Sequence, residues 1–219
     1  GTSMSETIVV AAFIGYILGS LPFAWVICKV RTGKDLRNLG SGNAGASNLR
    51  RVEGCEQFYF PAVILDAAKG LAAMYIAMKL GLKPEWQLFC GLMAEVGHCY
   101  PVWLKWQGGK GVATFLGVAL TVNPALALIA LITFAVLKKK KGYTSLASVV
   151  AAFVFSTVFS FMVCGAKAIG TSPAQLCGWI WLIYLLILWG HILNLNLIKL
   201  GYEPSGKQPR NHLHYGFVV

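Results

Sequence analysis

The sequence consists of long apolar blocks that carry few or no charges. The first block, residues 8–28, contains no charged residue, and five more follow at residues 58–78, 86–104, 111–137, 143–164 and 174–198. A helix needs about 20 apolar residues to cross the hydrocarbon core of a bilayer. With 57% hydrophobic residues the chain is not disordered, and blocks of this length are rare in soluble cores. The sequence predicts an all-α integral membrane protein with a single membrane domain over residues 1–219.

Residues 1–3 precede Met4 and are predicted to be a remnant of an expression vector, outside the fold. No basic segment precedes the first apolar block, and no cleavage site is evident after it. A removed signal peptide would show both features. The first block is therefore predicted to be a retained membrane span.

The cations are distributed unequally among the polar segments between the blocks. Of the 19 Lys and Arg residues, 15 fall on one predicted side of the membrane and three on the other, with Lys69 inside a span. The cation-rich side comprises residues 29–57, 103–111, 138–141 and 191–219. Since cytoplasmic loops carry the excess of Lys and Arg, these segments are predicted to face the cytoplasm. The N-terminus would then lie outside and the C-terminus inside.

The block at residues 111–137 begins and ends beside predicted cytoplasmic cations, so it must cross the membrane an even number of times. Asn123-Pro124 divides it into two pieces that are each too short for a perpendicular crossing. Pro lacks a backbone donor and biases the preceding residue away from helical geometry. We therefore expect a short helical hairpin, which together with five long spans makes a seven-helix bundle. A continuous, kinked span is the alternative.

Residues 35–51, DLRNLGSGNAGASNLRR, combine Gly, Asn, Ser and Arg in a way that a plain linker does not need. Glycine lets the backbone approach a ligand, successive amides form an anion-binding nest, and Arg51 can clamp an oxyanion with two hydrogen bonds. The pattern predicts a phosphate-binding loop. Its G-x-G-x-x-G spacing does not indicate a dinucleotide site, because a membrane span precedes it and the acid at the expected distance, Asp66, lies in another span.

Residues 97–114 contain GHCYP and then QGGKGVAT, which leads directly into the first short helix of the hairpin. A helix N-terminus supplies unpaired amides and positive potential, and Lys110 adds a full charge. The segment is not a Walker A loop, since Gly111 follows Lys110 where that motif has Ser or Thr. A second anion site is therefore predicted, without ATP hydrolysis.

A third polar set lies near the predicted cytoplasmic ends of the last two spans. His191 and Asn194 are three residues apart and share a helix face, as do Ser145 and Ser148. Each pair alone would be ordinary in a packed membrane helix. Three polar clusters on one side of the bundle predict a cytoplasm-facing site for two phosphates, or for one phosphate bound twice. Because this site borders lipid, an acyl chain is a natural further ligand.

Other patterns predict structure or exclude chemistry. Asp66 and Lys69 lie inside a span at i, i+3 and are predicted to form a structural ion pair, whereas Glu95 has no assigned role. The six Cys residues form no C-x-x-C pair, and the sequence contains no H-E-x-x-H. A metal site is therefore not expected.

Three motifs in order, GSGNAGASNLRR, GHCYP…GGKGVAT and HILN…LGYE, resemble those of the bacterial acyl-phosphate:glycerol-3-phosphate acyltransferase family, the PlsY type. The similarity extends from Gly19 to Glu203. It implies a seven-helix enzyme of the bacterial cytoplasmic (inner) membrane that transfers an acyl group from acyl phosphate to glycerol 3-phosphate. The products would be lysophosphatidic acid and phosphate, in the first step of phospholipid synthesis. The resemblance also implies that no cofactor, metal, acyl carrier protein or acyl-CoA takes part.

The resemblance also assigns site residues. The catalytic residues would be Lys110, Ser41, Ser148, His191 and Asn194. The residues that bind substrate phosphates would be Gly42, Asn43, Gly45, Ser47, Asn48, Arg51, Gly108, Gly109, Gly111 and Ser145. Two positions depart from the family pattern. Ser47 replaces a common Thr and keeps its hydroxyl, and Leu197 replaces the usual Arg, with Lys199 two residues on.

A general base is not obvious, because Asp35 and Glu203 are the only carboxylates in the motifs. We expect a substrate phosphate oxygen to accept the hydroxyl proton, with His191 orienting the substrate. The rival function is an organic-phosphate transporter, which also has basic loops and broken helices. Transporter sites, however, lie near the bilayer midplane between repeats, and this sequence shows no internal repeat.

Overall fold

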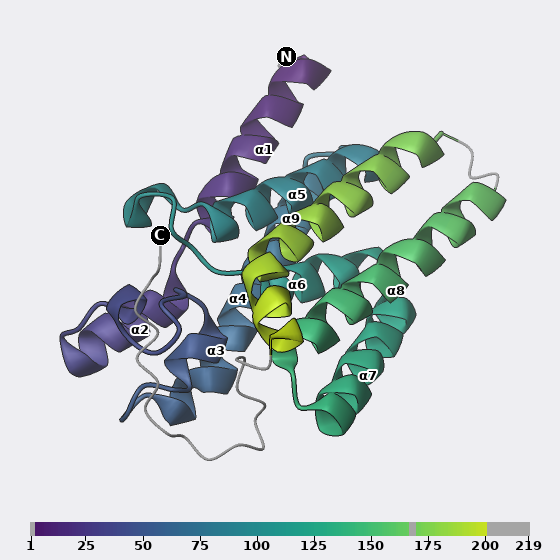
Figure 1. The fold of residues 1–219 in the computed structure, drawn as a ribbon. Coiled ribbons are helices and arrows are strands. Elements are labelled where there is room, and N and C mark those ends of the chain that lie inside the picture. The colour runs from purple at the N-terminus through teal and green to yellow at the C-terminus, as the bar shows by residue number, and fades with distance from the viewer. Residues whose placement is uncertain (1–2, 167–169, 201–219) are drawn as a thin grey trace.

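The computed structural model describes residues 3–166 and 170–200, and these fold into helices joined by turns and loops (Figure 1). No strand occurs in these two ranges, so the predicted all-α class is confirmed. Residues 1–2 and the tail with Glu203, Lys207 and Arg210 lie outside the described residues. The helices are α1 (Met4–Gly19), α2 (Phe23–Thr32), α3 (Ala46–Leu49), α4 (Tyr59–Lys79), α5 (Pro84–Cys99), α6 (Val112–Val122), α7 (Pro124–Lys141), α8 (Thr144–Gly165) and α9 (Pro173–Lys199), with the 3-10 helices η1 (Leu36–Asn38), η2 (Glu56–Phe58) and η3 (Val102–Leu104).

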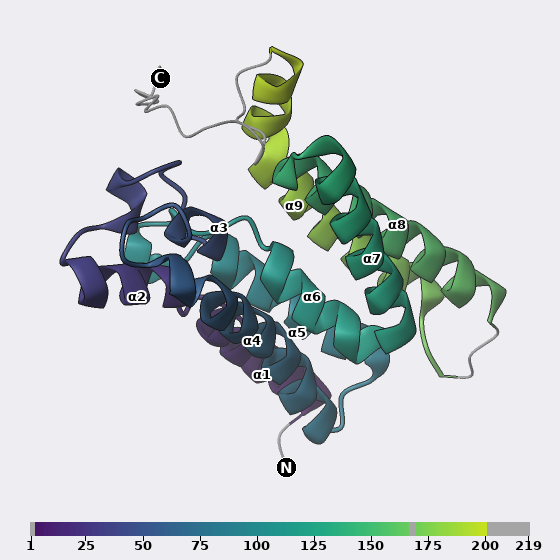
Figure 2. The same ribbon diagram turned by 90° about the horizontal axis from the view of Figure 1, so that it is seen from below.

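The prediction that residues 8–28 form one helix is wrong. α1 ends at Gly19 and α2 begins at Phe23, and the two helices point in different directions (Figures 1 and 2). Pro22 explains the break, because it lacks an N–H, its ring clashes with the preceding turn, and it disfavours helical geometry at Leu21. Within the described ranges eight helices have ten residues or more, one more than the predicted seven.

The third predicted span, residues 86–104, is shorter than expected. α5 has 16 residues and ends at Cys99, and Tyr100 leaves helical geometry with φ −130° and ψ 62°. Pro101 follows at once, and the residue before a proline is biased away from the helix. At 1.5 Å per residue, α5 is only about 24 Å long. Within the part of the chain that is described, four segments are long and apolar enough to cross a membrane: Met4–Thr32, Glu56–Lys79, Thr144–Gly165 and Pro173–Lys199.

The predicted hairpin at Asn123-Pro124 is confirmed. α6 ends at Val122, α7 begins at Pro124, and the chain reverses between them (Figure 2). The Asn123 side chain caps α7 by accepting a hydrogen bond from the backbone N–H of Leu126 at 3.0 Å. The alternative of one kinked span is therefore excluded. α6 packs mainly on α4, and α7 packs mainly on α8.

Small residues bring the helices into close contact. α1 lies directly against α5, and a side chain at Gly19 would overlap the Ala94 carbonyl. α4 meets α6 in the same way, because a side chain at Gly117 would overlap the Ala67 carbonyl. Without a hydrophobic driving force between helices in lipid, such close backbone approach is what stabilises their packing.

A buried ion pair connects α4 to the break between α1 and α2. The Asp66 and Lys69 side chains are each 3% exposed and lie 2.8 Å apart, which confirms the predicted pair. Lys69 Nζ also donates to the backbone carbonyl of Leu21 at 2.9 Å. This carbonyl has left the helical ladder at the break and accepts only a short-range backbone bond, from the Phe23 N–H at 3.2 Å, so Lys69 supplies a second, stronger donor.

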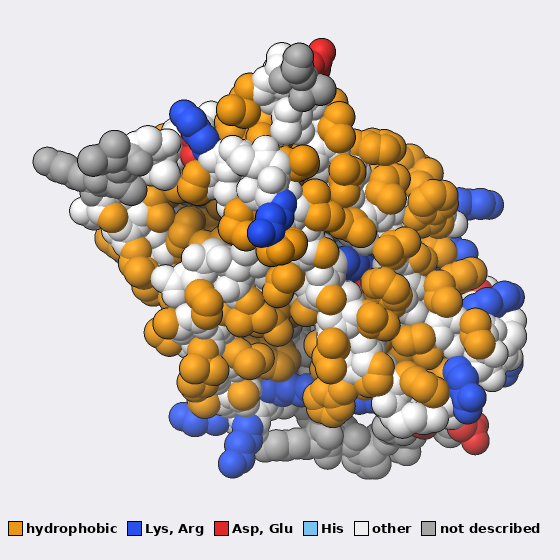
Figure 3. Space-filling model, turned by 180° about the vertical axis from the view of Figure 1, so that it is seen from behind, with side chains coloured by type: hydrophobic (Ala, Val, Ile, Leu, Met, Phe, Trp, Pro, Cys, Tyr) orange, Lys and Arg blue, Asp and Glu red, His pale blue; other side chains and the backbone are white. Residues whose placement is uncertain are grey.

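The outer surface is largely apolar. Large hydrophobic side chains such as Phe13, Ile64, Phe161 and Trp189 are 63–75% exposed. On the face shown in Figure 3, hydrophobic side chains cover most of the area and several Lys and Arg side chains gather along the lower edge. An apolar surface with a basic edge is expected of a chain that lies in lipid and has one end in the cation-rich interface.

Candidate active site

A cavity of about 320 Å³ has one polar and one apolar end. The apolar end lies between α6, α7 and α8, and the polar end lies where the two glycine-rich loops meet α8 and α9. The apolar lining includes Phe115, Leu116, Ala119, Ala127, Ala130, Leu131, Phe134, Ala151 and Ala152. The polar lining includes Ser41, Asn43, Gly45, Ser47, Asn48, Arg51, Lys110, Gly111, Thr144, Ser145, Ser148, His191 and Asn194. Residues that are distant in sequence are therefore brought to one place.

The buried Asn48 side chain holds the first loop in shape. Its amide nitrogen lies within hydrogen-bonding distance of the carbonyls of Leu36 at 3.1 Å, Leu39 at 2.8 Å and Asn43 at 2.9 Å. Its amide oxygen accepts from the backbone N–H of Ser41 at 2.8 Å. The loop backbone thus occupies the donors of this amide, which makes Asn48 an internal support of the loop.

The second loop lies flat on the end of α5, which requires glycine. The amides of Gly108 and Gly109 donate to the carbonyls of Cys99 and His98, each at 3.0 Å. A side chain at Gly109 would overlap the His98 ring, and one at Gly111, where φ is +83°, would overlap the Glu95 carboxyl. Backbone carbonyls therefore occupy the amide donors of Gly108 and Gly109, and the role of these two residues in phosphate binding stays a prediction. Neither residue lines the large cavity, and Gly42 also does not.

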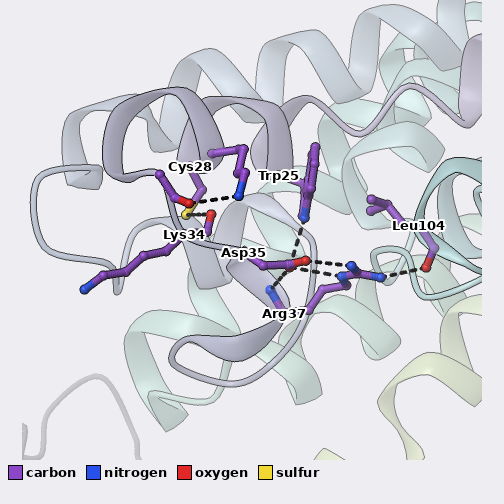
Figure 4. A network of polar contacts seen from close by, with 8 residues as sticks. Trp25, Cys28, Lys34, Asp35, Arg37 and Leu104 are labelled. Carbon is purple, nitrogen blue, oxygen red and sulfur yellow. Dashed lines mark hydrogen bonds and ion pairs between the residues drawn. The ribbon is translucent and has the colours of Figure 1, made fainter.

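Two contacts hold the first and second loops together. Asn43 Nδ2 donates to the Gly108 carbonyl at 3.4 Å, and Arg37 Nη1 donates to the Leu104 carbonyl at 2.8 Å. Figure 4 shows that Asp35 holds Arg37 for this purpose: its carboxylate accepts from Arg37 Nη2 at 2.6 Å and from Trp25 Nε1 at 2.9 Å. The hydrogen bonds from the Arg37 guanidinium hold the pKa of Asp35 well below its usual range.

Lys110 connects the second loop to the last helix. Its Nζ donates to Asn194 Oδ1 at 2.6 Å, and both side chains line the cavity. One turn before Asn194, the buried His191 places Nδ1 2.8 Å from the Ile187 carbonyl. Because a carbonyl can only accept, Nδ1 carries a proton, and Nε2 of the neutral ring is an acceptor. On α8, Ser148 Oγ donates to the Thr144 carbonyl at 2.9 Å and keeps its lone pairs for a ligand.

The sequence analysis missed several residues that line the cavity. Tyr59, Thr144, Asp66 and His98 all do so. The buried charge of Asp66 was a usable signal, because ionisable residues inside spans are functional candidates by default. His98 Nδ1 lies 3.7 Å from Asp66 Oδ1, so the ion pair beneath the loops extends to the cavity wall.

Comparison with known proteins decides between the functions considered from sequence. A family model described as "Glycerol-3-phosphate acyltransferase" matches residues 9–201. The glycerol-3-phosphate acyltransferase of Coxiella burnetii (strain CbuG_Q212) is 36% identical over 199 residues, 91% of this chain and 98% of that protein. That of Myxococcus xanthus (strain DK1622) is 38% identical over 190 residues, 83% and 91% of the two chains. The chain belongs to the glycerol-3-phosphate acyltransferase family.

Solved structures agree with this membership. The crystal structure of PlsY (YgiH), an integral membrane glycerol 3-phosphate acyltransferase in its glycerol 3-phosphate form, matches with a TM-score of 0.80 at 34% identity. The match covers 90% of this chain and 94% of that one. The lysophosphatidic acid form of PlsY matches with a TM-score of 0.77. The resemblance to the PlsY-type acyltransferase family is therefore confirmed, and the transporter alternative has no support from these relatives.

Proposed function

We propose that this protein transfers a fatty acyl group from acyl phosphate to glycerol 3-phosphate, giving lysophosphatidic acid and inorganic phosphate. The main support is one observation: Arg51 and Lys110, from two separate loops, line a single cavity that continues into an apolar slot. The family to which the chain belongs, and the two ligand forms of PlsY, support the acceptor and the lipid product. A phosphate pair at the polar end and an acyl tail at the apolar end suit this shape.

The polar end has the chemistry to hold two phosphates. Arg51 presents a planar fork that matches a phosphate with two hydrogen bonds. Lys110 supplies a second cation directly before the N-terminus of α6, where the first-turn amides lack helical partners. In this proposal side chains and the α6 N-terminus hold the phosphates, because backbone carbonyls occupy the Gly108 and Gly109 amides.

The reaction needs no covalent enzyme intermediate. The primary hydroxyl oxygen of glycerol 3-phosphate attacks the acyl carbonyl carbon and forms the ester bond. The bond from that carbon to the phosphate oxygen breaks, and phosphate leaves with the electron pair. A substrate phosphate oxygen takes the hydroxyl proton. Lys110, fixed by Asn194, stabilises the charge that develops on the leaving phosphate and on the carbonyl oxygen.

His191, Asn194 and Ser148 would orient the acceptor. With its Nδ1 proton donated to Ile187, the His191 ring is fixed and offers Nε2 as a hydrogen-bond acceptor that positions the bound glycerol 3-phosphate. Alignment of hydroxyl and carbonyl within one cavity can lower the barrier by several kcal/mol. The site would lie at the cytoplasmic face of a bacterial inner membrane, since the loops and the Lys138–Lys141 run belong to the cation-rich side.

An acyl-transfer assay with purified protein in detergent tests this proposal. Acyl phosphate should support product formation and acyl-CoA should not, in a system without a second compartment. Lys110→Ala should lower kcat by roughly 10²-fold or more, as loss of one charge-stabilising donor does. Lys83→Ala, on the predicted cation-poor side of the membrane, is the matched control and should retain activity. A preference for acyl-CoA would refute the donor assignment.

A further inference from the structure

Two cations outside the proposed catalytic group are held on the aromatic wall of the cavity. The Arg50 guanidinium carbon lies 4.9 Å from the centroid of the Tyr59 ring, and Lys138 Nζ lies 5.5 Å from the centroid of the Phe134 ring. Tyr59 begins α4 and Phe134 belongs to α7, and both rings line the cavity. The two cations themselves do not line the cavity, and each is held beside the lining by its contact with one ring.

The two cations carry positive charge that no described carboxylate neutralises. Their positive charges repel, and neither has a carboxylate within salt-bridge distance among residues 3–166 and 170–200. Both side chains are half-buried, whereas Lys139, Lys140 and Lys141 on the same helix end are exposed. Like charges that are partly withdrawn from water gain most when an anion enters between them.

The surroundings indicate which anion fits. Leu131 and Phe134 on α7 continue from Lys138 into the apolar slot, and Tyr59, Phe60 and Val63 do the same on α4. A phosphate between the cations could therefore keep an attached acyl chain in the slot. Arg51, the next residue after Arg50, lines the polar end, so an outer and an inner phosphate position lie close together along the chain.

We infer that Arg50 and Lys138 form an outer site, beside the aromatic wall of the cavity, that binds the terminal phosphate of a single-chain lipid. The inference rests on the proposed function. The lipid would be acyl phosphate on its way in or lysophosphatidic acid on its way out, and both carry one phosphate on one acyl chain. Basic side chains at the interface attract such head groups from the bilayer.

The test compares the double variant Arg50→Gln/Lys138→Gln with the matched control Lys139→Gln/Lys140→Gln in neutral detergent. The Arg50→Gln/Lys138→Gln variant should raise KM for acyl phosphate, the inhibition constant of lysophosphatidic acid, or both. Because two charge-assisted contacts are lost, the increase should be roughly tenfold. KM for glycerol 3-phosphate and kcat should stay within about twofold, and the control should behave like the wild type. The constant that rises identifies the lipid that uses the site.

A binding measurement without turnover separates this inference from the proposed function. Wild-type protein should bind lysophosphatidic acid more tightly than lysophosphatidylcholine, and the Arg50→Gln/Lys138→Gln variant should lose that preference while unfolding at the wild-type temperature. Unchanged lipid constants, an equal loss in the control pair, or a change confined to glycerol 3-phosphate would each overturn the outer site. A wild-type protein that binds lysophosphatidic acid but transfers no acyl group would contradict the function alone.

A second inference follows independently from two cysteines. The sulfurs of Cys164, in the last turn of α8, and Cys177, near the start of α9, lie 3.9 Å apart. Cys164 is exposed and Cys177 is half-exposed, whereas the other four cysteines are buried. The charge distribution places this end of α8 and α9 on the side opposite the cytoplasm, where disulfides persist.

We propose that Cys164 and Cys177 form a disulfide under oxidising conditions. The two thiols lose two protons and two electrons as the S–S bond forms, and a disulfide of the compartment accepts the electrons and is reduced to its thiols. Bond rotation about the side chains can close the gap to a bonded distance. The cross-link would join the ends of α8 and α9 and restrict the unfolded chain.

Thiol counting in detergent, before and after treatment with oxidised glutathione, tests the disulfide. The wild type should lose two reactive thiols, yield a linked peptide pair containing both residues, and unfold a few degrees higher than the reduced protein. The Cys164→Ser variant should lose no reactive thiol to an internal disulfide, whereas Cys28→Ser should behave as the wild type does. An unchanged thiol count, or a linked pair that omits either residue, would refute the proposal.

Discussion

At the scale of single residues, Asn48 and His191 show what a motif can and cannot predict. Both were assigned to the site from sequence, and both line the cavity. However, the Asn48 amide nitrogen is engaged by backbone carbonyls, and the proton on His191 Nδ1 is donated to Ile187. A motif places a residue in a loop or on a helix face, but the direction of its polar atoms depends on partners that only the folded chain supplies.

His191→Gln tests whether this ring orients the acceptor or removes its proton. If His191 orients, Gln can still offer a polar group to the acceptor, and kcat/KM should fall by less than about tenfold with an unchanged pH profile. His191→Leu, similar in bulk without a polar group, should be much less active. If His191→Gln instead loses nearly all activity and shifts the pH profile, His191 would be identified as the general base.

At the scale of elements, the hairpin was predicted and the break in the first span was not. Asn123-Pro124 lies in the middle of a block that must reverse. The flanking cations and the proline therefore predicted the same turn. Pro22 was equally visible, but a 21-residue charge-free block argued for one span. The break is stable because Lys69, from α4, donates to the Leu21 carbonyl, and such a long-range partner leaves no local trace in the sequence.

Lys69→Met should therefore destabilise the protein by about 3 kcal/mol, because it leaves Asp66 charged and buried without its partner. Unfolding in detergent, followed by helical signal against temperature, measures this. The double variant Asp66→Asn/Lys69→Met should regain part of the loss. Lys79→Met, at the exposed end of the same helix, should change stability by less than about 0.5 kcal/mol. Equal effects of the two single variants would contradict the role given to the ion pair.

The contact between the two loops should depend on pH. Asp35 has a folded pKa below its unfolded value of about 3.9, so its charge stabilises the fold above that value, and the contribution is lost as pH falls toward the folded pKa. Asp35→Asn should lower the unfolding temperature at pH 7, and the difference from the wild type should shrink below about pH 4. Because the carboxylate is partly exposed, the effect at pH 7 should not exceed about 1 kcal/mol. The difference in unfolding temperature between Arg37→Gln and the wild type should also shrink below about pH 4. A difference that does not depend on pH would contradict this account.

At the scale of the whole molecule, hydropathy and charge predicted an all-helical membrane protein with polar clusters at one end. The structure places Arg51, Lys110 and His191 around one cavity, as the sequence predicted. What sequence could not supply was the joint between the loops. Arg37 reaches Leu104 across 67 positions of the chain, and no pattern within either segment encodes that distance.

The orientation in the membrane has a direct test. A cysteine introduced at Lys34 should react with a membrane-impermeant thiol reagent in inside-out vesicles, and one at Lys83 should react in right-side-out cells. Cys164 and Cys177 should first be replaced by Ser, since the other native cysteines are buried. Reaction of both positions from the same side would refute the predicted topology.

The two arms of the α6–α7 hairpin are joined by the single residue Asn123, yet one arm packs on α4 and the other on α8. The width of the apolar slot is thus set by how two separate helix groups lie relative to each other in the bilayer. Substitutions on the outer faces of α4 or α8, far from any reacting atom, should alter which fatty tails fit. A thicker or stiffer bilayer should do the same without any change in sequence.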